Sequence, residues 1–233
     1  MKLAVMSDIH GNLEAFKAVL ADAEARGVEK IVCLGDLGGG SNPLECVDLA
    51  AELRKEGKLE ACLLGNCDQA TLFDATEGER IGEEAAFWSR ERLERSLSPR
   101  ALERWDFFGE MPRVYKKGEF LFVHGSPRNP LNEYVYSDDA ADDEKMTKLF
   151  ALTPRYCFLG HTHVPGVFVE DEDGERSYFS ASELAGGVFP LDERKLLVNV
   201  GSVGQPRGDA ASCYVVVRYE EGGVDNSVEF RRP

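Results

Sequence analysis

The chain has 233 residues, of which 43% are hydrophobic and 30% are charged, and its formal net charge at pH 7 is -15. This length suits one domain with a substantial core, and no apolar run approaches the roughly 20 residues of a membrane span. The acidic balance argues against a nucleic-acid surface, because phosphate backbones are bound through clustered Lys and Arg. We therefore expect a soluble single domain over residues 1–233.

The N-terminal part of the sequence predicts two strand-helix units. Residues 2–7 are typical of a buried strand, and apolar side chains then recur at helical spacing from Leu13 until Gly27. A second strand, 30–34, leads to a helix over 42–57 that starts at Asn42-Pro43, a favourable N-cap and N1 pair. The first βα units of an α/β sheet are indicated.

The rest of the chain predicts more strands and fewer helices. A strand at 59–64 precedes a charged amphipathic helix at 81–97, which is typical of a solvated helix face. A hairpin follows later, joined by residues 171–174. The predicted strands after residue 100 are 120–123, 156–159, the two hairpin strands 167–170 and 177–180, and 195–200, 212–219 and 227–230. Two packed sheets with helices outside fit this pattern.

Residues 126–146 lack a clear period and carry an acidic run at 137–144. One interpretation is a lid beside a site, since long irregular connections often serve as lids. The other is that the acidic run caps the next helix, because Asp and Glu favour a helix N-terminus. If the segment is a lid, the best candidates to meet a substrate are Asn132, Glu133, Tyr134 and Tyr136.

All four histidines follow predicted strands in short clusters that contain glycine or aspartate: His10, His124, His161 and His163. Neutral imidazole is the commonest protein metal ligand, and sites in α/β sheets lie just past the carboxyl ends of strands. Asp8, Asp36 and Asn66 occupy equivalent places after other predicted strands. These seven side chains suffice for two divalent ions.

Each of these side chains also has a structural alternative. Asp8 and His10 could cap the following helix, while Asp36 and Asn66 could form side-chain turns with their own backbone. The histidines near residue 160 could be half-buried strand residues. Together these alternatives require seven independent coincidences, so we favour metal binding.

The order Asp8-x-His10, Gly35-Asp36, Gly65-Asn66-x-Asp68, His124-Gly125, Gly160-His161-x-His163 resembles the calcineurin-like metallophosphoesterases. Further matches run to about Arg207. The stretches 7–15 and 199–207 are similar to a narrower group of small bacterial-type phosphodiesterases related to the diadenosine tetraphosphatases. Single motifs of this kind occur by chance, but five in the same order do not.

The resemblance implies a mixed α/β fold, a four-layer αββα sandwich. It also implies two divalent ions bridged by Asp36, one held by Asp8, His10 and His163 and the other by Asn66, His124 and His161. Mixed oxygen and imidazole ligands suit Mn, Fe, Zn, Co or Ni, with Mn favoured. Such a pair can hold a hydroxide that attacks phosphorus.

Catalytic roles are expected for Asp36, Asn66 and His124, with Cys67 and Arg207 as further candidates. Cys67 stands where many relatives carry a histidine, and it is either a small packing residue or a weak general acid. Arg207, or with less support Arg128, could reach a substrate phosphate or pair with a surface carboxylate. Asp68 could orient a ligand.

The function expected is a metal-dependent phosphoric ester hydrolase acting on a small nucleotide-like phosphodiester or phosphoanhydride. Alternatives are a protein phosphatase of the serine/threonine type and a non-catalytic scaffold of the same fold, while charge disfavours a nuclease. Six cysteines without a Cys-x-x-Cys pair and an N-terminus that enters a strand at once predict a cytoplasmic protein. A homo-oligomer is possible, and no membrane association is expected.

Overall fold

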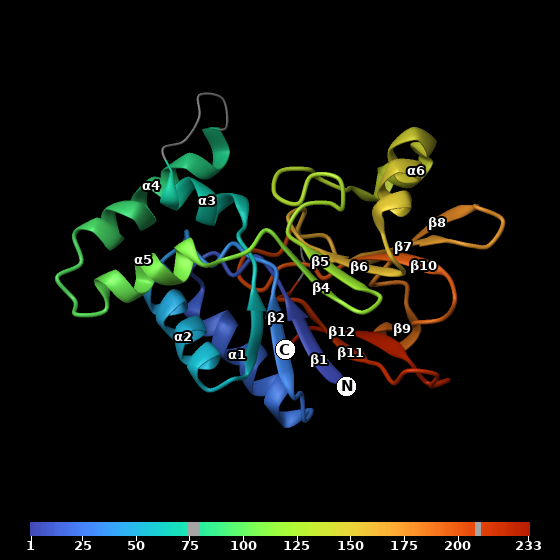
Figure 1. Ribbon diagram of the computed structural model, residues 1–233, viewed down its shortest axis with the longest axis horizontal. Helices are drawn as coiled ribbons and strands as arrows, with labels where there is room; N and C mark the ends of the chain where they lie inside the picture. The colour runs from blue at the N-terminus through green and yellow to red at the C-terminus, as the bar shows by residue number, and fades with distance from the viewer. Residues whose placement is uncertain (74–79, 208–210) are drawn as a thin grey trace.

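The structure is a computed structural model that describes residues 1–73, 80–207 and 211–233. Two six-stranded sheets pack face to face, with helices on both outer sides (Figure 1). This arrangement confirms the expected four-layer αββα sandwich with mixed sheets. Among the described residues, no helix combines the length and apolar character needed to cross a bilayer.

The first sheet combines strands from both ends of the chain, whereas the second is built from residues 114–199. The first sheet contains, in spatial order, β3 (Leu59–Cys62), β2 (Lys30–Cys33), β1 (Lys2–Met6), β11 (Tyr214–Arg218), β12 (Ser227–Arg231) and β9 (Val188–Pro190). The second contains β4 (Val114–Lys117), β5 (Phe120–Val123), β6 (Tyr156–Leu159), β10 (Lys195–Asn199), β7 (Gly166–Glu170) and β8 (Arg176–Ser180). The strands β1 to β3 are mutually parallel, as are β5, β6 and β10.

Most helices lie on the side of the first sheet, and one α-helix covers the second (Figure 1). The first group is α1 (Leu13–Ala25), α2 (Pro43–Lys55), α3 (Asn66–Leu72), α4 (Arg80–Glu94) and α5 (Ala101–Gly109). The helix α6 (Asp143–Leu152) covers the second sheet, and 3-10 turns occur at Ser137–Ala141 and Ala185–Gly187.

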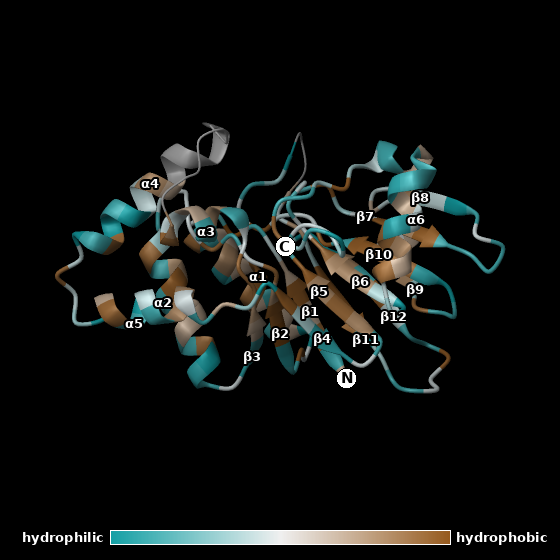
Figure 2. Cartoon of the chain, turned by 45° about the horizontal axis from the view of Figure 1, so that its top comes forward, coloured by the Kyte–Doolittle hydropathy of each residue, from teal (hydrophilic) through white to brown (hydrophobic). Residues whose placement is uncertain are grey.

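The strand β1 illustrates how the sequence produces these layers. Its side chains alternate, so Leu3 and Val5 join the core between the two sheets, while Ala4 and Met6 join the core beneath the helices. All four side chains are fully buried. Both faces of a central strand are thus apolar, and the sheets appear as a continuous hydrophobic band (Figure 2).

Sequence patterns located most elements. The predicted hairpin is the antiparallel pair β7 and β8. The helices α3 and α5 and the strands β4 and β9 were not predicted. Asn42 precedes α2 as predicted, but its side chain forms no capping hydrogen bond.

The segment 126–146 combines features of both predictions. Asp142 caps α6, where its side chain accepts a hydrogen bond from the Lys145 backbone N–H at 2.9 Å. Tyr134, in the same segment, lines a polar pocket. The acidic run therefore caps a helix, and the residues before it border a cavity.

An ion pair between α2 and α5 gives a prediction about stability. Arg104, only 8% exposed, donates from Nε and Nη2 to the two carboxylate oxygens of Asp48 at 2.8 and 2.6 Å. We expect Asp48→Asn to lower the free energy of unfolding by about 2 kcal/mol at pH 7, as for hydrogen bonds to charged groups. Urea unfolding measures this, with Asp106→Asn on exposed α5 surface as the control.

The same pair predicts how that difference depends on pH. Burial opposes ionisation of Asp48, but the Arg104 guanidinium outweighs it and holds the carboxyl pKa below its usual 3.8. A carboxyl whose pKa is lowered by folding stabilises the folded state at any pH above its unfolded pKa. This stabilisation is lost as the pH falls through the folded pKa. The difference between the two proteins should therefore persist from neutral pH to about pH 4 and vanish below. A difference that shrinks on approaching neutral pH would contradict this.

Candidate metal centre

The predicted ligands converge at one edge of the sandwich, because parallel strands end at the same edge. Loops after β1, β2 and β3 carry Asp8, Asp36 and Asn66, and loops after β5 and β6 carry His124 and His161. Asn66 is also the first residue of α3. All seven predicted ligands belong to this one cluster.

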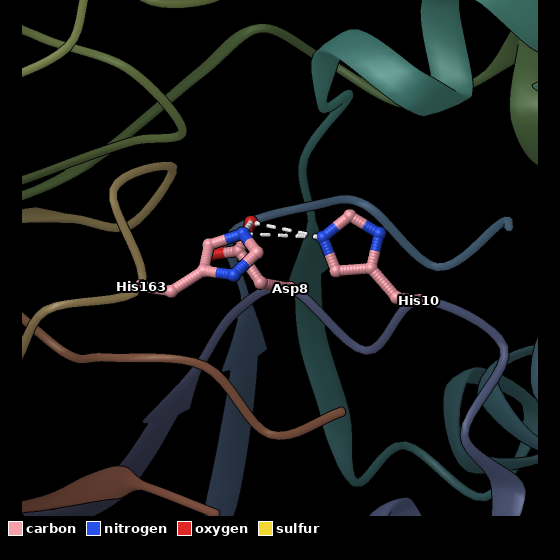
Figure 3. Close-up of side chains that lie close together, drawn as sticks. All are labelled: Asp8, His10 and His163. Atoms are coloured by element: carbon pink, nitrogen blue, oxygen red, sulfur yellow. Dashed lines mark hydrogen bonds and ion pairs between the residues drawn. The ribbon is translucent and has the colours of Figure 1, made fainter. Parts of the chain in front are cut away.

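One half of the cluster is formed by Asp8, His10 and His163 (Figure 3). The Nε2 atoms of His10 and His163 lie 3.2 Å apart. The Oδ1 atom of Asp8 lies 3.2 Å from His163 Nε2 and 3.6 Å from His10 Nε2. Residues separated by 153 positions in the chain thus present their ligand atoms to one point.

The other half of the cluster is formed by Asn66, His124 and His161. His124 Nε2 lies 3.0 Å from Asn66 Oδ1 and 3.1 Å from His161 Nδ1. Asp36 lies between the halves, with its Oδ2 atom 3.6 Å from both His10 Nε2 and His124 Nε2. A single carboxylate oxygen is therefore shared by the two groups.

The backbone at the cluster is strained in a consistent way. Within the described parts of the chain, five non-glycine residues have positive φ, between 44° and 66°: Asp8, His10, Asp36, His161 and His163. Such conformations cost about 1 kcal/mol or more each, and they cluster at functional sites. Every one of the five is a predicted metal ligand.

The geometry of the cluster fits bound cations. Two ligand atoms about 2.1 Å from one ion, at tetrahedral or octahedral angles, lie about 3.0–3.4 Å apart. The facing imidazole nitrogens of each half have this spacing. Asp8 Oδ1 is buried without a hydrogen-bond partner, and such an orphaned carboxylate oxygen is satisfied by a cation.

The charges in the cluster shift its pKa values in opposite directions. Burial opposes ionisation of Asp8, but the facing His10 and His163 hold its pKa well below the usual value. Burial likewise opposes protonation of His10, yet the Asp8 and Asp36 carboxylates raise its pKa. Burial, together with neighbouring His124, lowers the pKa of His161 to about 4, which keeps that imidazole neutral and able to ligate.

Asp68 holds the two loops around Asp36 together. Its carboxylate accepts hydrogen bonds from the backbone N–H groups of Asp36 at 2.6 Å, Gly38 at 3.1 Å and Gly65 at 3.1 Å. Burial and the charge of Asp36 raise the pKa of Asp68 to about 6. The position agrees with the predicted orienting role of Asp68.

Cys67 is buried beside the shared carboxylate. Its backbone N–H donates to Asp36 Oδ1 at 2.9 Å, which leaves Oδ2 directed at the histidines. Burial and the charges of Asp36 and Asp68 raise the pKa of the Cys67 thiol well above its usual value. The side chain is therefore a neutral thiol on the pocket wall.

Two residues that were not predicted as part of the site, Asn199 and Gln205, form hydrogen bonds that orient the histidines or their loop. The Nδ1–H of His163 donates to the Gln205 carbonyl at 2.6 Å, which directs Nε2 into the cluster. The buried Asn199 amide donates to Gly160 O and Thr162 Oγ1, both at 2.8 Å. Asn199 and Gln205 lie in the stretch 199–207 that matched the family pattern, and this was the available signal.

A pocket of about 470 Å³ opens onto the cluster. Arg207 lines it, whereas Arg128 is held by Glu133 in a two-bond ion pair and does not line it. Glu133 is thereby engaged as well. The other lining residues are His10, Gly11, Asn12, Asp36, Gly40, Ser41, Asn42, Asn66, Cys67, Tyr134, His161, His163, Gly204 and Gln205.

The structural alternatives for Asp8, His10, His161 and His163 do not describe this arrangement. The cap of α1 is Asn12, whose Oδ1 accepts from the Ala15 N–H at 3.1 Å, and neither Asp8 nor His10 takes that role. His161 and His163 lie in a loop after β6 and are less than 7% exposed.

Comparison with known proteins identifies a family and a relative. A sequence profile of the calcineurin-like phosphoesterase superfamily domain matches residues 1–222. An uncharacterized protein of Methanocaldococcus jannaschii is 34% identical over 215 residues, which cover 88% of this chain and 77% of the relative.

Solved structures agree as well. A metallophosphoesterase from Sphaerobacter thermophilus superposes with a TM-score of 0.77 at 30% identity, covering 100% of this chain and 88% of that one. A hypothetical protein from Pyrococcus horikoshii shares the fold, with a TM-score of 0.69 at 18% identity over 99% of this chain and 87% of its own.

Proposed function

The chain belongs to the calcineurin-like phosphoesterase superfamily, and from this premise we propose that it is a dimetal hydrolase of small nucleotide-like phosphodiesters or phosphoanhydrides. The observation that carries the proposal is the position of Asp36 Oδ2, 3.6 Å from an imidazole nitrogen in each half of the cluster. A shared carboxylate oxygen is what a pair of closely spaced ions requires.

We propose that Asp8, His10 and His163 hold one divalent ion, that Asn66, His124 and His161 hold the other, and that Asp36 bridges them. When bound, two such ions lower the pKa of water and withdraw charge from phosphate oxygens, and Mn is the favoured metal. In hydrolysis, a water oxygen bonds to phosphorus as the bond to the leaving oxygen breaks.

The remaining pocket residues suit a small anionic substrate. A volume of about 470 Å³ lies in the usual range for small-molecule sites. The exposed guanidinium of Arg207 at the pocket wall can bind a phosphate oxygen that does not react. Polar groups of Asn12, Ser41 and Asn42 line the same wall and can orient the substrate by hydrogen bonds.

Two broader properties are part of the proposal. Residues 1–233 form one domain, because the central core draws side chains from both sheets. The location is cytoplasmic, and the free state of all six cysteines agrees with a reducing compartment.

The identity of Cys67 predicts the order of substrate preference. A thiol is a poor general acid, so the enzyme should favour substrates whose leaving group departs without a proton. With Mn²⁺, we expect kcat/KM for bis(p-nitrophenyl) phosphate and diadenosine tetraphosphate to exceed that for an alkyl monoester by at least about tenfold. Hydrolysis assays with these substrates and p-nitrophenyl phosphate, with and without EDTA, measure this.

The outcomes of these assays separate the alternatives. Preferred cleavage of the alkyl monoester would contradict the role given to Cys67. Absence of any metal-dependent turnover would contradict the hydrolase and favour the non-catalytic scaffold. Turnover of a phosphoserine peptide in preference to all small substrates would favour the protein phosphatase.

A further inference from the structure

Three nearly parallel rings lead from the metal cluster to the protein surface. The ring of Tyr134 stacks on the His161 imidazole, with centroids 3.7 Å apart and an interplanar angle of 17°. Tyr136 lies beside Tyr134, with centroids 5.5 Å apart and an angle of 8°. Tyr134 is 44% exposed and Tyr136 is 50% exposed, so the pair keeps much of its aromatic surface in water.

The backbone fixes this pair in place. The backbone at Tyr136 is extended (φ -90°, ψ 160°), and Val135 between the tyrosines is buried in the core under α6. The Tyr134 carbonyl accepts a hydrogen bond from Lys145 Nζ at 2.8 Å. The Tyr136 N–H donates to Asp139 Oδ2 at 2.7 Å, and Lys145 pairs with the same carboxylate. The backbone that carries the two tyrosine rings is therefore held in place by these contacts.

The location of Tyr134 distinguishes the pair from ordinary surface aromatics. Tyr134 lines the same pocket as Asp36 and Arg207, so its ring borders the space that a phosphate ester would fill. Tyr136 is not itself a lining residue, and its ring extends the aromatic surface outward from Tyr134. Exposed rings elsewhere, such as Phe87 with 58% exposure, lie outside this pocket. Planar bases stack on aromatic side chains, and base identity matters little because every base has a π-face.

We propose that the Tyr134–Tyr136 pair is a stacking platform for the planar base of the substrate, and that it selects nucleotide-like esters over those without a base. The inference rests on the proposed function, since it places the reacting phosphate at the metal cluster. It names the substrate class by chemistry: a phosphate ester or anhydride that carries an aromatic heterocycle within reach of the pocket.

Equilibrium binding tests the platform without requiring turnover. Adenosine 5′-monophosphate and ribose 5-phosphate share the sugar and the phosphate and differ only in the base. In Mn²⁺ buffer, calorimetry with the intact protein should give about tenfold tighter binding of the nucleotide, as expected for one stacked base. Tyr136→Ala should lower this ratio because half of the aromatic surface is lost, whereas Tyr136→Phe should preserve it because the ring remains.

Tyr136 is the better position to substitute, because Tyr134 also packs on His161 and its loss would disturb the cluster. Phe87→Ala is the matched control, since it removes a ring of similar exposure on α4 that does not belong to the Tyr134–Tyr136 pair. We expect the control to keep the ratio of affinities found for the unaltered protein.

The results separate the platform from the proposed hydrolase. Equal affinity for the two probes, binding of neither, or a ratio that Tyr136→Ala leaves unchanged would overturn the platform. A Tyr136-dependent preference for the nucleotide would support it even if none of the test esters were hydrolysed, in which case only the proposed reaction would fail.

Discussion

Asp36→Asn is expected to lower kcat/KM for bis(p-nitrophenyl) phosphate by at least about 10³-fold, the size of effect seen when a key electrostatic group is removed from an active site. Asparagine retains the shape of the side chain and can still accept the Cys67 N–H at Oδ1. With the amide oxygen at the Oδ1 position, an uncharged NH2 group takes the place of the shared Oδ2, which lies 3.6 Å from Nε2 of both His10 and His124. The substitution therefore targets the bridge and spares the packing.

The measurement combines kinetics with metal content. Steady-state hydrolysis in Mn²⁺ gives kcat/KM, and metal analysis after dialysis should give two ions per chain for the unaltered protein and fewer for Asp36→Asn. Asp106→Asn, an exposed carboxylate on α5, is the matched control and should leave both quantities unchanged. Full activity of Asp36→Asn with two bound ions would show that this carboxylate does not bridge the metals.

Gly160→Ala is expected to reduce both stability and activity. A Cβ atom at this position would lie 2.2 Å from Ser7 Oγ and 2.6 Å from Asp8 Oδ2. Both neighbours are fully buried at the end of β1, so neither can move into solvent. The new methyl group would also weaken the hydrogen bond from His161 N–H to Asp8 Oδ2, now 3.0 Å long.

We expect this overpacking to lower the free energy of unfolding by about 2 kcal/mol and the rate of ester hydrolysis by at least about tenfold. Urea unfolding and the diester assay measure the two effects. Gly109→Ala, where a Cβ atom meets nothing within 4 Å at the end of α5, is the control and should change stability by less than about 1 kcal/mol. Unchanged stability and activity in Gly160→Ala would contradict this prediction, because it would mean that a methyl group fits between Gly160 and its neighbours Ser7 and Asp8.

Some features of the site were predictable because they depend on local sequence. An apolar run followed by a glycine and a polar residue, in either order, marks a strand end, and this pattern located Asp36, Asn66 and His124. Because parallel strands carry their loops at one edge, the sequence also predicted that these side chains meet. The order of the motifs pointed to the family and hence to the four-layer fold.

Other features were not predictable because they depend on contacts between distant parts of the chain. Nothing local to Asn199 signals that its amide holds the loop around His161. The segment 126–146 offered two interpretations, and only packing against the second sheet decided that Asp142 caps α6 while Tyr134 faces the pocket.

The sequence alone thus determined the residue types of the site, the strand ends that carry them and the family to which the fold belongs. The tertiary structure alone decided which side chains face each other: His10 with His163, His124 with His161, and Asp36 between them. The reason is physical. Periodicity and motif order are set by neighbours in the chain, whereas side-chain direction at a shared edge is set by the packing of two sheets whose contacts span most of its length.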